Sequence, residues 1–193
     1  MGNAFKLKDS VSIQIKEIRP DELSAYCHGL TITYGCATSL FGTILVAYVP
    51  DGICYLSFVD DNLEEQLKEL KNNWPGATLS PETQQQAQTL LSLLQETNSE
   101  IPILSVCLSG TDLQRQVWKA LLQVHKGETS SYTQIAQTVG RPKAVRAVAS
   151  AIGKNPVSWI IPCHRILHKD GSLSGYRWNA KRKQQLLDWE RTK

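Results

Sequence analysis

The 193-residue sequence predicts two domains: an α/β domain over residues 27–108, with a small antiparallel sheet and helices, and a mostly α-helical domain over 109–193 that contains a helix-turn-helix. The first segment mixes strand-like and helical runs of apolar residues, whereas the second follows helical spacing. Composition supports a globular fold, because 41% of the residues are hydrophobic and 20% are charged. The first 26 residues carry no strong core signal, and we expect an N-terminal extension there, as a tail or a peripheral strand.

Strand-forming runs predict the sheet of the first domain. Three runs rich in β-branched and aromatic residues occur at 29–36, 41–49 and 52–59. Pro50 and Asp51 separate the last two runs, and this pair predicts a tight hairpin between them. We therefore expect three consecutive strands in this region.

Two helices are expected after the strands. Leucines at helical spacing, with charged residues on the other side, predict an amphipathic helix over 62–74 that is ended by Pro75 and Gly76. Ser80, followed by a proline and a glutamate, predicts the start of a second helix that runs to about Thr97.

A change of pattern near Gly110 marks the expected domain boundary. The strand-like run 102–109 is followed there by apolar residues at helical spacing. Two short helical segments come next, at about 132–138 and 143–152, with a glycine and a proline between them. A short helix, a glycine turn and a second helix opened by proline form the outline of a helix-turn-helix.

Charge is divided unevenly between the two halves of the chain. Residues 1–100 contain 6 basic and 13 acidic side chains, whereas residues 101–193 contain 15 basic and 5 acidic ones. The overall net charge of +3 hides this asymmetry. The C-terminal half is therefore the one that a polyanion would meet.

The second helix of the helix-turn-helix has a small and basic outer face. Its inward residues are apolar: Val145, Val148, Ala149 and Ile152. The opposite side has no acidic residue: Lys143, Arg146, Ala147, Ser150 and Lys154. Small side chains let a helix approach a nucleic-acid groove closely, and lysines at both ends can meet phosphates. A solvated face would more usually combine glutamate with lysine, so the pattern favours a nucleic-acid surface.

Other features exclude several classes of protein. No apolar run reaches the roughly 18 residues that span a bilayer, and the first twenty residues lack the apolar core of a signal peptide, so a soluble cytoplasmic protein is expected. Five cysteines at irregular spacing, with no CxxC pair, predict reduced thiols. Cys27, His28 and Cys36 have irregular spacing and no fourth ligand, and we expect no metal site.

Reactive residues interrupt the apolar run VSWIIPCHRILH at 157–168. The run is interrupted by Pro162, Cys163, His164 and Arg165, of which the last three carry reactive or titratable side chains. A neighbouring imidazole can help to deprotonate a thiol and make it a nucleophile. A cysteine and a histidine packed side by side in a core remain the alternative on these residues alone.

Several ordered motifs extend over the second half. They are IPCHR at 161–165, SYTQIA at 131–136, GRPKAVRAVASA at 140–151, Asn155 with Pro156, DGSLSGYRW at 170–178, and Lys183 with LLDWE at 186–190. With these motifs in this order, the chain resembles the O6-alkylguanine-DNA alkyltransferase family, and most of all the C-terminal domain of bacterial Ada proteins. Weaker similarity extends back to about Gly29. The resemblance implies an RNase H-like first domain and a winged-helix-like second domain.

The resemblance implies that Cys163 accepts an alkyl group from O6 of a damaged guanine. His164 would take the thiol proton through a bound water, and Glu190 would orient the imidazole. Tyr132 would donate to N3 of the departing guanine, and Asn155 would hold the helix-turn-helix against the active-site segment. Nothing in the sequence suggests a way to regenerate the thiol, so each molecule would act once. No cofactor is expected, because the substrate supplies the electrophilic carbon.

The resemblance also implies how the damaged base is recognised. The guanine must leave the stack of the duplex, at a cost of roughly a few kcal/mol. Arg146 would fill the vacated space, with the second helix of the motif in the minor groove. Main-chain carbonyls of Cys163 and Ile166 would bind the guanine amino group, the amide of Arg177 would lie near O6, and Tyr176 would wall the pocket.

Trp178 stands at a pocket position that is often glycine in relatives, so its bulk would narrow the pocket and favour methyl over benzyl adducts.

The expected activity is that of a single-turnover methylated-DNA-protein-cysteine S-methyltransferase acting on guanine O6, and on thymine O4, in alkylated double-stranded DNA. A monomer without an obligate protein partner is expected, associated with the nucleoid in a bacterial cytoplasm. The four-cysteine zinc domain and the AraC-like portion of Ada proteins have no counterpart in the sequence, so phosphotriester sensing and transcriptional activation are not expected.

Two rival functions belong to other classes. A non-catalytic DNA protein that binds or signals alkyl lesions would share the fold, but such alkyltransferase-like proteins carry another residue in place of Cys163. A hydrolase that uses Cys163 and His164 would need an oxyanion site, and it would not explain the basic helix face.

Overall fold

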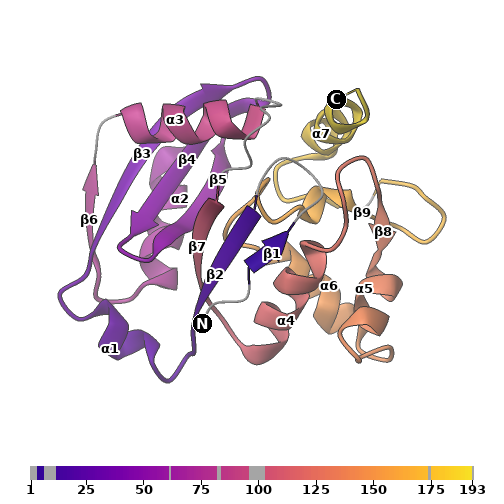
Figure 1. Cartoon of the computed structure of the whole chain (residues 1–193), viewed down its shortest axis with the longest axis horizontal. Coiled ribbons are helices and arrows are strands. Elements are labelled where there is room, and N and C mark those ends of the chain that lie inside the picture. The colour runs from indigo at the N-terminus through magenta and orange to yellow at the C-terminus, as the bar shows by residue number, and fades with distance from the viewer. Residues whose placement is uncertain are drawn as a thin grey trace.

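The computed structural model describes residues 4–6, 12–60, 62–81, 84–95, 103–173 and 175–192. A first unit with a seven-stranded sheet packs beside a second, mostly helical unit (Figure 1). The strands are β1 Ala4–Lys6, β2 Ser12–Ile18, β3 Thr31–Ser39, β4 Gly42–Val49, β5 Gly52–Val59, β6 Thr78–Pro81, β7 Ile103–Ser109, β8 Ser130–Ser131 and β9 Ile166–Leu167. The helices are α1 Leu23–Cys27, α2 Leu63–Asn73, α3 Gln84–Gln95, α4 Asp112–Leu121, α5 Tyr132–Thr138, α6 Val145–Gly153, the 3-10 turn η1 Cys163–Arg165, and α7 Ala180–Arg191.

The main sheet is larger than the sequence predicts, and it is mixed. Its order is β1-β2-β7-β5-β4-β3-β6 within the described ranges. Strands β3, β4 and β5 form the expected antiparallel neighbours, and this part of the prediction is confirmed. Parallel pairs of β2 with β7, β5 with β7, and β3 with β6 were not anticipated, so the expectation of a small antiparallel sheet is wrong. These pairs join segments that lie far apart in sequence, where local periodicity carries no pairing information.

The N-terminal residues belong to the sheet instead of forming an extension. Strand β2 pairs along its whole length with β7, from Ser12 opposite Ile103 to Ile18 opposite Ser109. Ile13 and Ile18 are buried in the core. Of the two alternatives expected for residues 1–26, a tail is wrong for residues 12–18 and a strand is confirmed, although β2 lies between β1 and β7 and not at the periphery of the sheet. Residues 1–3 and 7–11 lie outside the described residues.

A second difference concerns the start of α3. The sequence predicts a helix from Ser80, but Thr78–Pro81 form strand β6, which pairs in parallel with β3. The helix begins at Gln84 and ends at Gln95. A proline at the end of an edge strand needs no ladder partner for its nitrogen, which reconciles Pro81 with a strand. The expected end near Thr97 lies outside the described residues.

Helices cover both faces of the sheet. Val46 on β4 packs in one core with Leu90 and Leu91 of α3, whereas its neighbour Leu45 packs in a second core with Leu70 of α2. Successive strand residues point to opposite faces, so α2 and α3 lie on opposite sides of β4. The central strands therefore read as continuous apolar runs.

The second unit contains the expected helix-turn-helix. Thr111 caps α4 and Ser131 caps α5, and each forms a reciprocal capping box with a glutamine three residues later. Helix α5 begins and ends where the sequence predicts, and α6 begins at Val145 after a turn at Gly140. In the described part of the chain, no helix has the length and apolar character needed to cross a membrane.

The segment after α6 joins the two units through the sheet. The amide of Leu56 on β5 donates to the carbonyl of Pro156 at 2.9 Å, and the amide of Ser158 donates to the carbonyl of Leu56 at 2.8 Å. Leu56 lies beyond the pair of Ile53 with Val106, so residues of the second unit bind β5 where its pairing with β7 has ended. The active-site segment that follows therefore starts from a fixed point on the first unit.

Aromatic side chains and one arginine fill the junction. Trp159 packs edge to face on Phe41 and on Trp189 of α7, and it stacks on Phe58. The buried guanidinium of Arg182 on α7 donates to the carbonyls of Phe41 and Trp178 and to the carboxylate of Asp60. Arg182 thus ties α7 to the β3–β4 turn and to the end of β5.

Replacing Arg182 with methionine should lower the free energy of unfolding by about 2–4 kcal/mol, because two buried carbonyls lose their donor. Arg191→Met on the same helix is the matched control, since its ion pair with Asp188 is exposed and should contribute less than about 1 kcal/mol. Urea unfolding followed by circular dichroism measures both. Equal losses in the two variants would contradict the role of Arg182 in the junction.

Candidate active site

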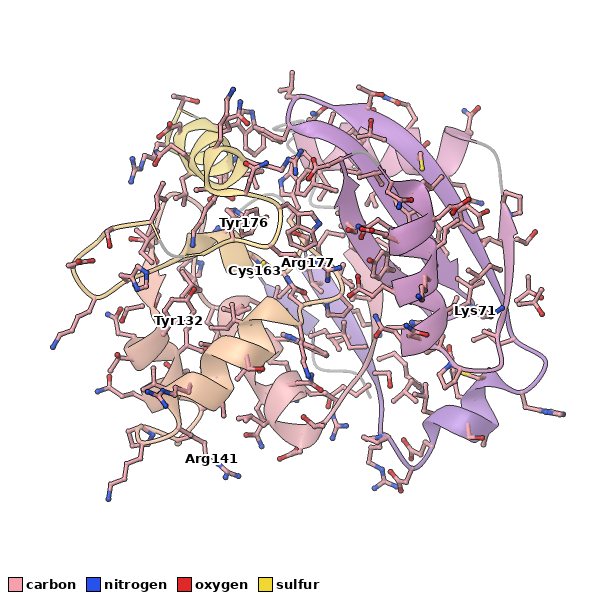
Figure 2. All side chains as sticks on the ribbon, turned by 180° about the vertical axis from the view of Figure 1, so that it is seen from behind. Lys71, Tyr132, Arg141, Cys163, Tyr176 and Arg177 are labelled. Atoms are coloured by element: carbon pink, nitrogen blue, oxygen red, sulfur yellow. The ribbon has the colours of Figure 1, made fainter. Side chains whose placement is uncertain are left out.

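Cys163 lies in a buried turn between the two units. Residues 155–166 are all buried, and Cys163 begins the 3-10 turn η1 with a side chain that is only 6% exposed. Figure 2 shows Cys163, Tyr176 and Arg177 between the two units, with Tyr132 on the side of α5. Of the apolar run 157–168, residues 157–166 are buried, whereas Leu167 is partly exposed and His168 is exposed.

Asn155 holds the nucleophile in place. Its Nδ2 donates to the carbonyl of Ile161 at 2.8 Å and to Sγ of Cys163 at 3.2 Å, while its Oδ1 accepts from the amide of Val157 at 3.0 Å. One buried amide thus connects the end of α6, the bridge to β5 and the sulfur atom. A contact from an N–H donor stabilises a thiolate more than a thiol.

The resting state of Cys163 is the neutral thiol. Burial raises the pKa of Cys163, although hydrogen bonds from Asn155 and Ser158 and the charge of Lys183 oppose this effect. Removal of the proton therefore needs a base. The arrangement suppresses unselective reactions of the sulfur while leaving several groups ready to stabilise negative charge.

His164 and Glu190 form the predicted pair. His164 is fully buried, and its Nε2 lies 2.8 Å from Oε1 of Glu190, which is 4% exposed. An ionised carboxylate only accepts hydrogen bonds, so the proton of the neutral imidazole sits on Nε2. Nδ1 is then an acceptor, and it has no hydrogen-bond partner within the described ranges.

Arg165 makes this carboxylate strongly acidic. Its Nε donates to Oε2 of Glu190 at 2.9 Å, its Nη2 donates to Oε1 at 2.9 Å, and its Nη1 donates to the carbonyl of Val124. Burial alone would raise the pKa of Glu190, but His164 and Arg165 outweigh this effect and lower the pKa to about 2. Burial also lowers the pKa of His164, despite the opposing influence of Glu190. The imidazole is therefore a neutral base at pH 7.

Lys183 and Arg165 are two site residues that the sequence analysis did not assign. The ammonium group of Lys183 donates to the carbonyl of Ile166 and lies 5.9 Å from the ring centre of Tyr176. Burial lowers the pKa of Lys183 to about 8, so the group is charged at pH 7 and favours a thiolate at Cys163. Helical spacing places Lys183 on the buried side of α7 with Leu186 and Glu190, and this signal was available in the sequence.

Three consecutive residues that were expected at the substrate pocket precede helix α7: Tyr176, Arg177 and Trp178. The hydroxyl group of Tyr176 lies 3.2 Å from Oγ of Ser158, and burial raises the pKa of Tyr176. Arg177 reaches Glu69 of α2, and the buried Trp178 donates from Nε1 to Oγ of Ser57 at 3.0 Å. Two of the three side chains therefore contact the first unit.

Other predicted residues lie on α5, α6 and the adjoining turns, outside the hydrogen-bond network of Cys163 in the described structure. Tyr132 is the first residue of α5 and is partly exposed, with its ring centre 6.1 Å from that of His168. The outer face of α6 is exposed as predicted, and it comprises Lys143, Arg146, Ala147, Ser150 and Lys154. Arg141, which was not assigned, adds a further exposed cation at the turn before α6 (Figure 2).

The cysteines were also examined as possible ligands. All five are free thiols, and Cys27 is buried. The described residues contain no group of three or more histidine, cysteine, aspartate or glutamate side chains that could hold a metal ion.

Comparison with known proteins identifies relatives along most of the chain. The family described as "6-O-methylguanine DNA methyltransferase, DNA binding domain" matches residues 112–192. The regulatory protein Ada of Salmonella typhimurium is 41% identical over 166 residues, which are 85% of this chain and 47% of that protein. An inducible methylated-DNA–protein-cysteine methyltransferase of Bacillus subtilis is 34% identical over 76% of this chain and 83% of its own length. The chain spans about half the length of the Ada relatives that it matches.

Solved structures similar to this fold also come from DNA methyltransferases. The crystal structure of Mycobacterium tuberculosis OGT in complex with DNA superposes with a TM-score of 0.67 and 31% sequence identity, covering 84% of this chain and 93% of that one. Both units are included in such a match, because it extends well beyond the region from 112 to 192. The identity of 34% to the Bacillus subtilis protein extends over 83% of that protein, and the fold comparison agrees with it. The chain therefore belongs to the methylated-DNA–protein-cysteine methyltransferase family.

Proposed function

We propose that this chain removes alkyl groups from O6 of guanine, and from O4 of thymine, in double-stranded DNA and transfers them irreversibly to its own Cys163. The observation that carries the proposal is the buried sulfur of Cys163 beside an imidazole that Glu190 holds in one tautomer. The Bacillus subtilis relative is named for transfer from methylated DNA to a protein cysteine, and the Mycobacterium tuberculosis relative is described in complex with DNA.

The proton of Cys163 goes to His164. Nδ1 of His164 has no hydrogen-bond partner among the described residues, so the imidazole and Sγ of Cys163 are not bonded directly. A single water between Sγ and Nδ1 completes the path, as in other water-mediated contacts. The charge of Glu190 stabilises the imidazolium that results, and Lys183 favours the thiolate.

The transfer itself is one displacement. The thiolate attacks the alkyl carbon, the new S–C bond forms, and the C–O6 bond breaks with its electron pair leaving on guanine. Tyr132 donates to N3 of the departing base, and the amide of Arg177 stabilises charge at O6. The thioether retains the alkyl group, so one molecule repairs one lesion. No cofactor enters this scheme.

Base recognition uses the second unit. The outer face of α6 lies in the minor groove, where its small side chains allow close approach and Arg146 occupies the space of the flipped base. Lys143 and Lys154 at the ends of α6, together with Ser150, contact the sugar-phosphate backbone. Inside the pocket, the carbonyls of Cys163 and Ile166 accept hydrogen bonds from the guanine amino group. Asn155 keeps α6 and the nucleophile in register.

The proposal includes finer assignments of fold and context. Residues 109–193 form the DNA-binding and catalytic domain with a winged-helix-like fold, and the match over 112–192 supports this boundary. The first domain, 27–108 together with strand β2, is RNase H-like. The protein acts as a monomer with no obligate protein partner, in the cytoplasm where DNA is available.

The best rival is a protein that binds alkylated bases without transferring the alkyl group. The retained Cys163 argues against it, because a protein that only binds the lesion needs no thiol nucleophile in the pocket. A cysteine hydrolase is a weaker rival, since it leaves the exposed basic face of α6 without a function.

Incubation with a duplex that carries O6-methylguanine should add one methyl group to the protein, located on Cys163. Cys163→Ser should remove the transfer, because an alcohol is a far weaker nucleophile than a thiol. Cys36→Ser, a change at another free thiol, should react like the wild type. Intact mass and peptide mapping measure the product; multiple turnover, or tight binding without modification, would contradict the proposal.

Replacing Arg146 with alanine should slow transfer from duplex DNA about tenfold or more, because the cost of an unfilled stack is a few kcal/mol. Reaction with the free base O6-benzylguanine should stay close to the wild-type rate, since this substrate needs no flipping. Arg191→Ala, on the exposed side of α7, is the control for loss of one positive charge. An equal loss on duplex and free base would argue against a role in flipping.

Glu190→Gln should slow transfer about tenfold to a hundredfold, because the imidazolium loses its counter-charge.

The same variant should change the stability of the protein in acid. The carboxyl has a pKa of 4.5 in its ordinary state and about 2 in the folded protein, so the unfolded chain binds more protons between these values. The stabilisation, about 3 kcal/mol, is present above pH 4.5 and is lost as the pH falls toward 2.

Urea unfolding at pH 5 and at pH 3 measures this effect. Wild type should lose stability between these values, whereas Glu190→Gln should lose much less. Asp188→Asn, at an exposed carboxylate of the same helix, should retain the acid loss of the wild type. A loss in Glu190→Gln as large as in the wild type would show that another group carries the acid sensitivity.

A further inference from the structure

The loop from Gly175 to Trp178 is attached to the first unit by neighbouring side chains. Tyr176 faces the active site, where its hydroxyl group meets Ser158 and its ring lies below the ammonium group of Lys183. Arg177 and Trp178 reach instead to α2 and β5 of the first unit. Whatever fixes Arg177 and Trp178 therefore also fixes the direction of Tyr176.

The contact of Arg177 with Glu69 is bidentate. Nη1 donates to Oε1 at 2.6 Å, and Nη2 donates to Oε2. The two side chains are 31% and 29% exposed, so the pair is partly shielded from water. A paired fork of this kind fixes orientation as well as distance, unlike most surface ion pairs.

Glu69 is itself held by the first unit. The buried Tyr55 of β5 donates to Oε2 of Glu69 at 2.8 Å. Burial alone would raise the pKa of Glu69, but hydrogen bonds from Arg177 and Tyr55 lower it, so the carboxylate is charged at pH 7. Glu69 is therefore an ionised acceptor that Tyr55 also orients.

Trp178 completes the attachment. The guanidinium of Arg177 lies 5.1 Å from the ring centre of Trp178, and Nε1 of this tryptophan donates to Oγ of Ser57. Trp178 also packs edge to face on Tyr176 with 5.3 Å between ring centres. A displacement of Arg177 would therefore be transmitted to both aromatic side chains.

We propose that Glu69 is a positioning residue that limits the size of the alkyl group accepted at Cys163, by holding the 175–178 loop through Arg177. This inference rests on the proposed function and extends it to a residue of the first unit. With the pair intact, Tyr176 and Trp178 form a fixed wall, and small groups fit better than bulky ones. Without the Arg177–Glu69 pair, Tyr176 and Trp178 can move apart from Cys163, and a benzyl group fits with less steric strain.

The first experiment compares single-turnover rate constants for duplexes that carry O6-methylguanine or O6-benzylguanine. Glu69→Gln keeps the shape of the side chain and removes its charge, and it should raise the benzyl-to-methyl ratio about three- to tenfold. Glu65→Gln is the matched control, because Glu65 is an exposed carboxylate on the same helix. In an Arg177→Gln background, Glu69→Gln should change the ratio by less than about twofold, since it acts through Arg177.

The second experiment needs no transfer activity. Trypsin cleaves after arginine, and a guanidinium engaged by Glu69 is protected from the protease. Native-state digestion of Glu69→Gln should produce the fragment that begins at Trp178 about fivefold faster than wild type or Glu65→Gln. Urea unfolding of each variant shows whether a faster cut reflects the loop alone or the whole protein.

The two experiments distinguish the possible failures. An unchanged ratio in Glu69→Gln, with a reactive wild type, overturns the positioning role, and so does an additive effect in the Arg177→Gln background. A wild type that gains no alkyl group overturns the proposed function and the size limit together. Faster digestion of Glu69→Gln would even then support the attachment of the loop, and unchanged digestion would overturn it.

Discussion

The active site depends on one buried carboxylate. An unpaired charge in the interior is costly, and Glu190 is stable there only because Arg165 and His164 both donate to it. Arg165 also donates to the carbonyl of Val124, in the turn that follows α4. The requirement to satisfy one carboxylate thus joins this turn, the turn η1 and α7. Because Cys163 directly precedes His164 in η1, the same arrangement also fixes the position of Cys163.

Burial of Cys163 explains why its sulfur is unreactive at rest although groups that stabilise a thiolate surround it. A thiol with a raised pKa is inert toward most encounters, and the protein keeps Cys163 in that state. The groups that favour the thiolate, Asn155 and Lys183, are already in place and need no rearrangement. In the proposed mechanism, the remaining step before attack is proton removal by His164, and transfer follows when a substrate carbon is in position.

Sequence reasoning succeeded where the information is local. Helices α5 and α6 follow from capping residues and from 3.6-residue periodicity, and the exposed face around Arg146 follows from the same pattern. It failed for strand β2, whose partner β7 lies about 90 residues away, because pairing over such a distance leaves no local trace. The catalytic set was assigned through family resemblance. Arg165 was missed because a charged residue in an apolar run does not reveal its partner.

None of the side chains that we propose for the transfer chemistry belongs to the first unit, which also carries most of the acidic residues of the chain. Its acidic surface does not attract DNA, whereas Tyr55, Ser57 and Glu69 hold the loop that carries Tyr176. In the proposed single-turnover reaction the alkyl group stays on the protein, so a pocket wall held by the first unit would not slow any later turnover. The usual conflict between a rigid site and product release is therefore absent, and two units can be tied together at the pocket itself.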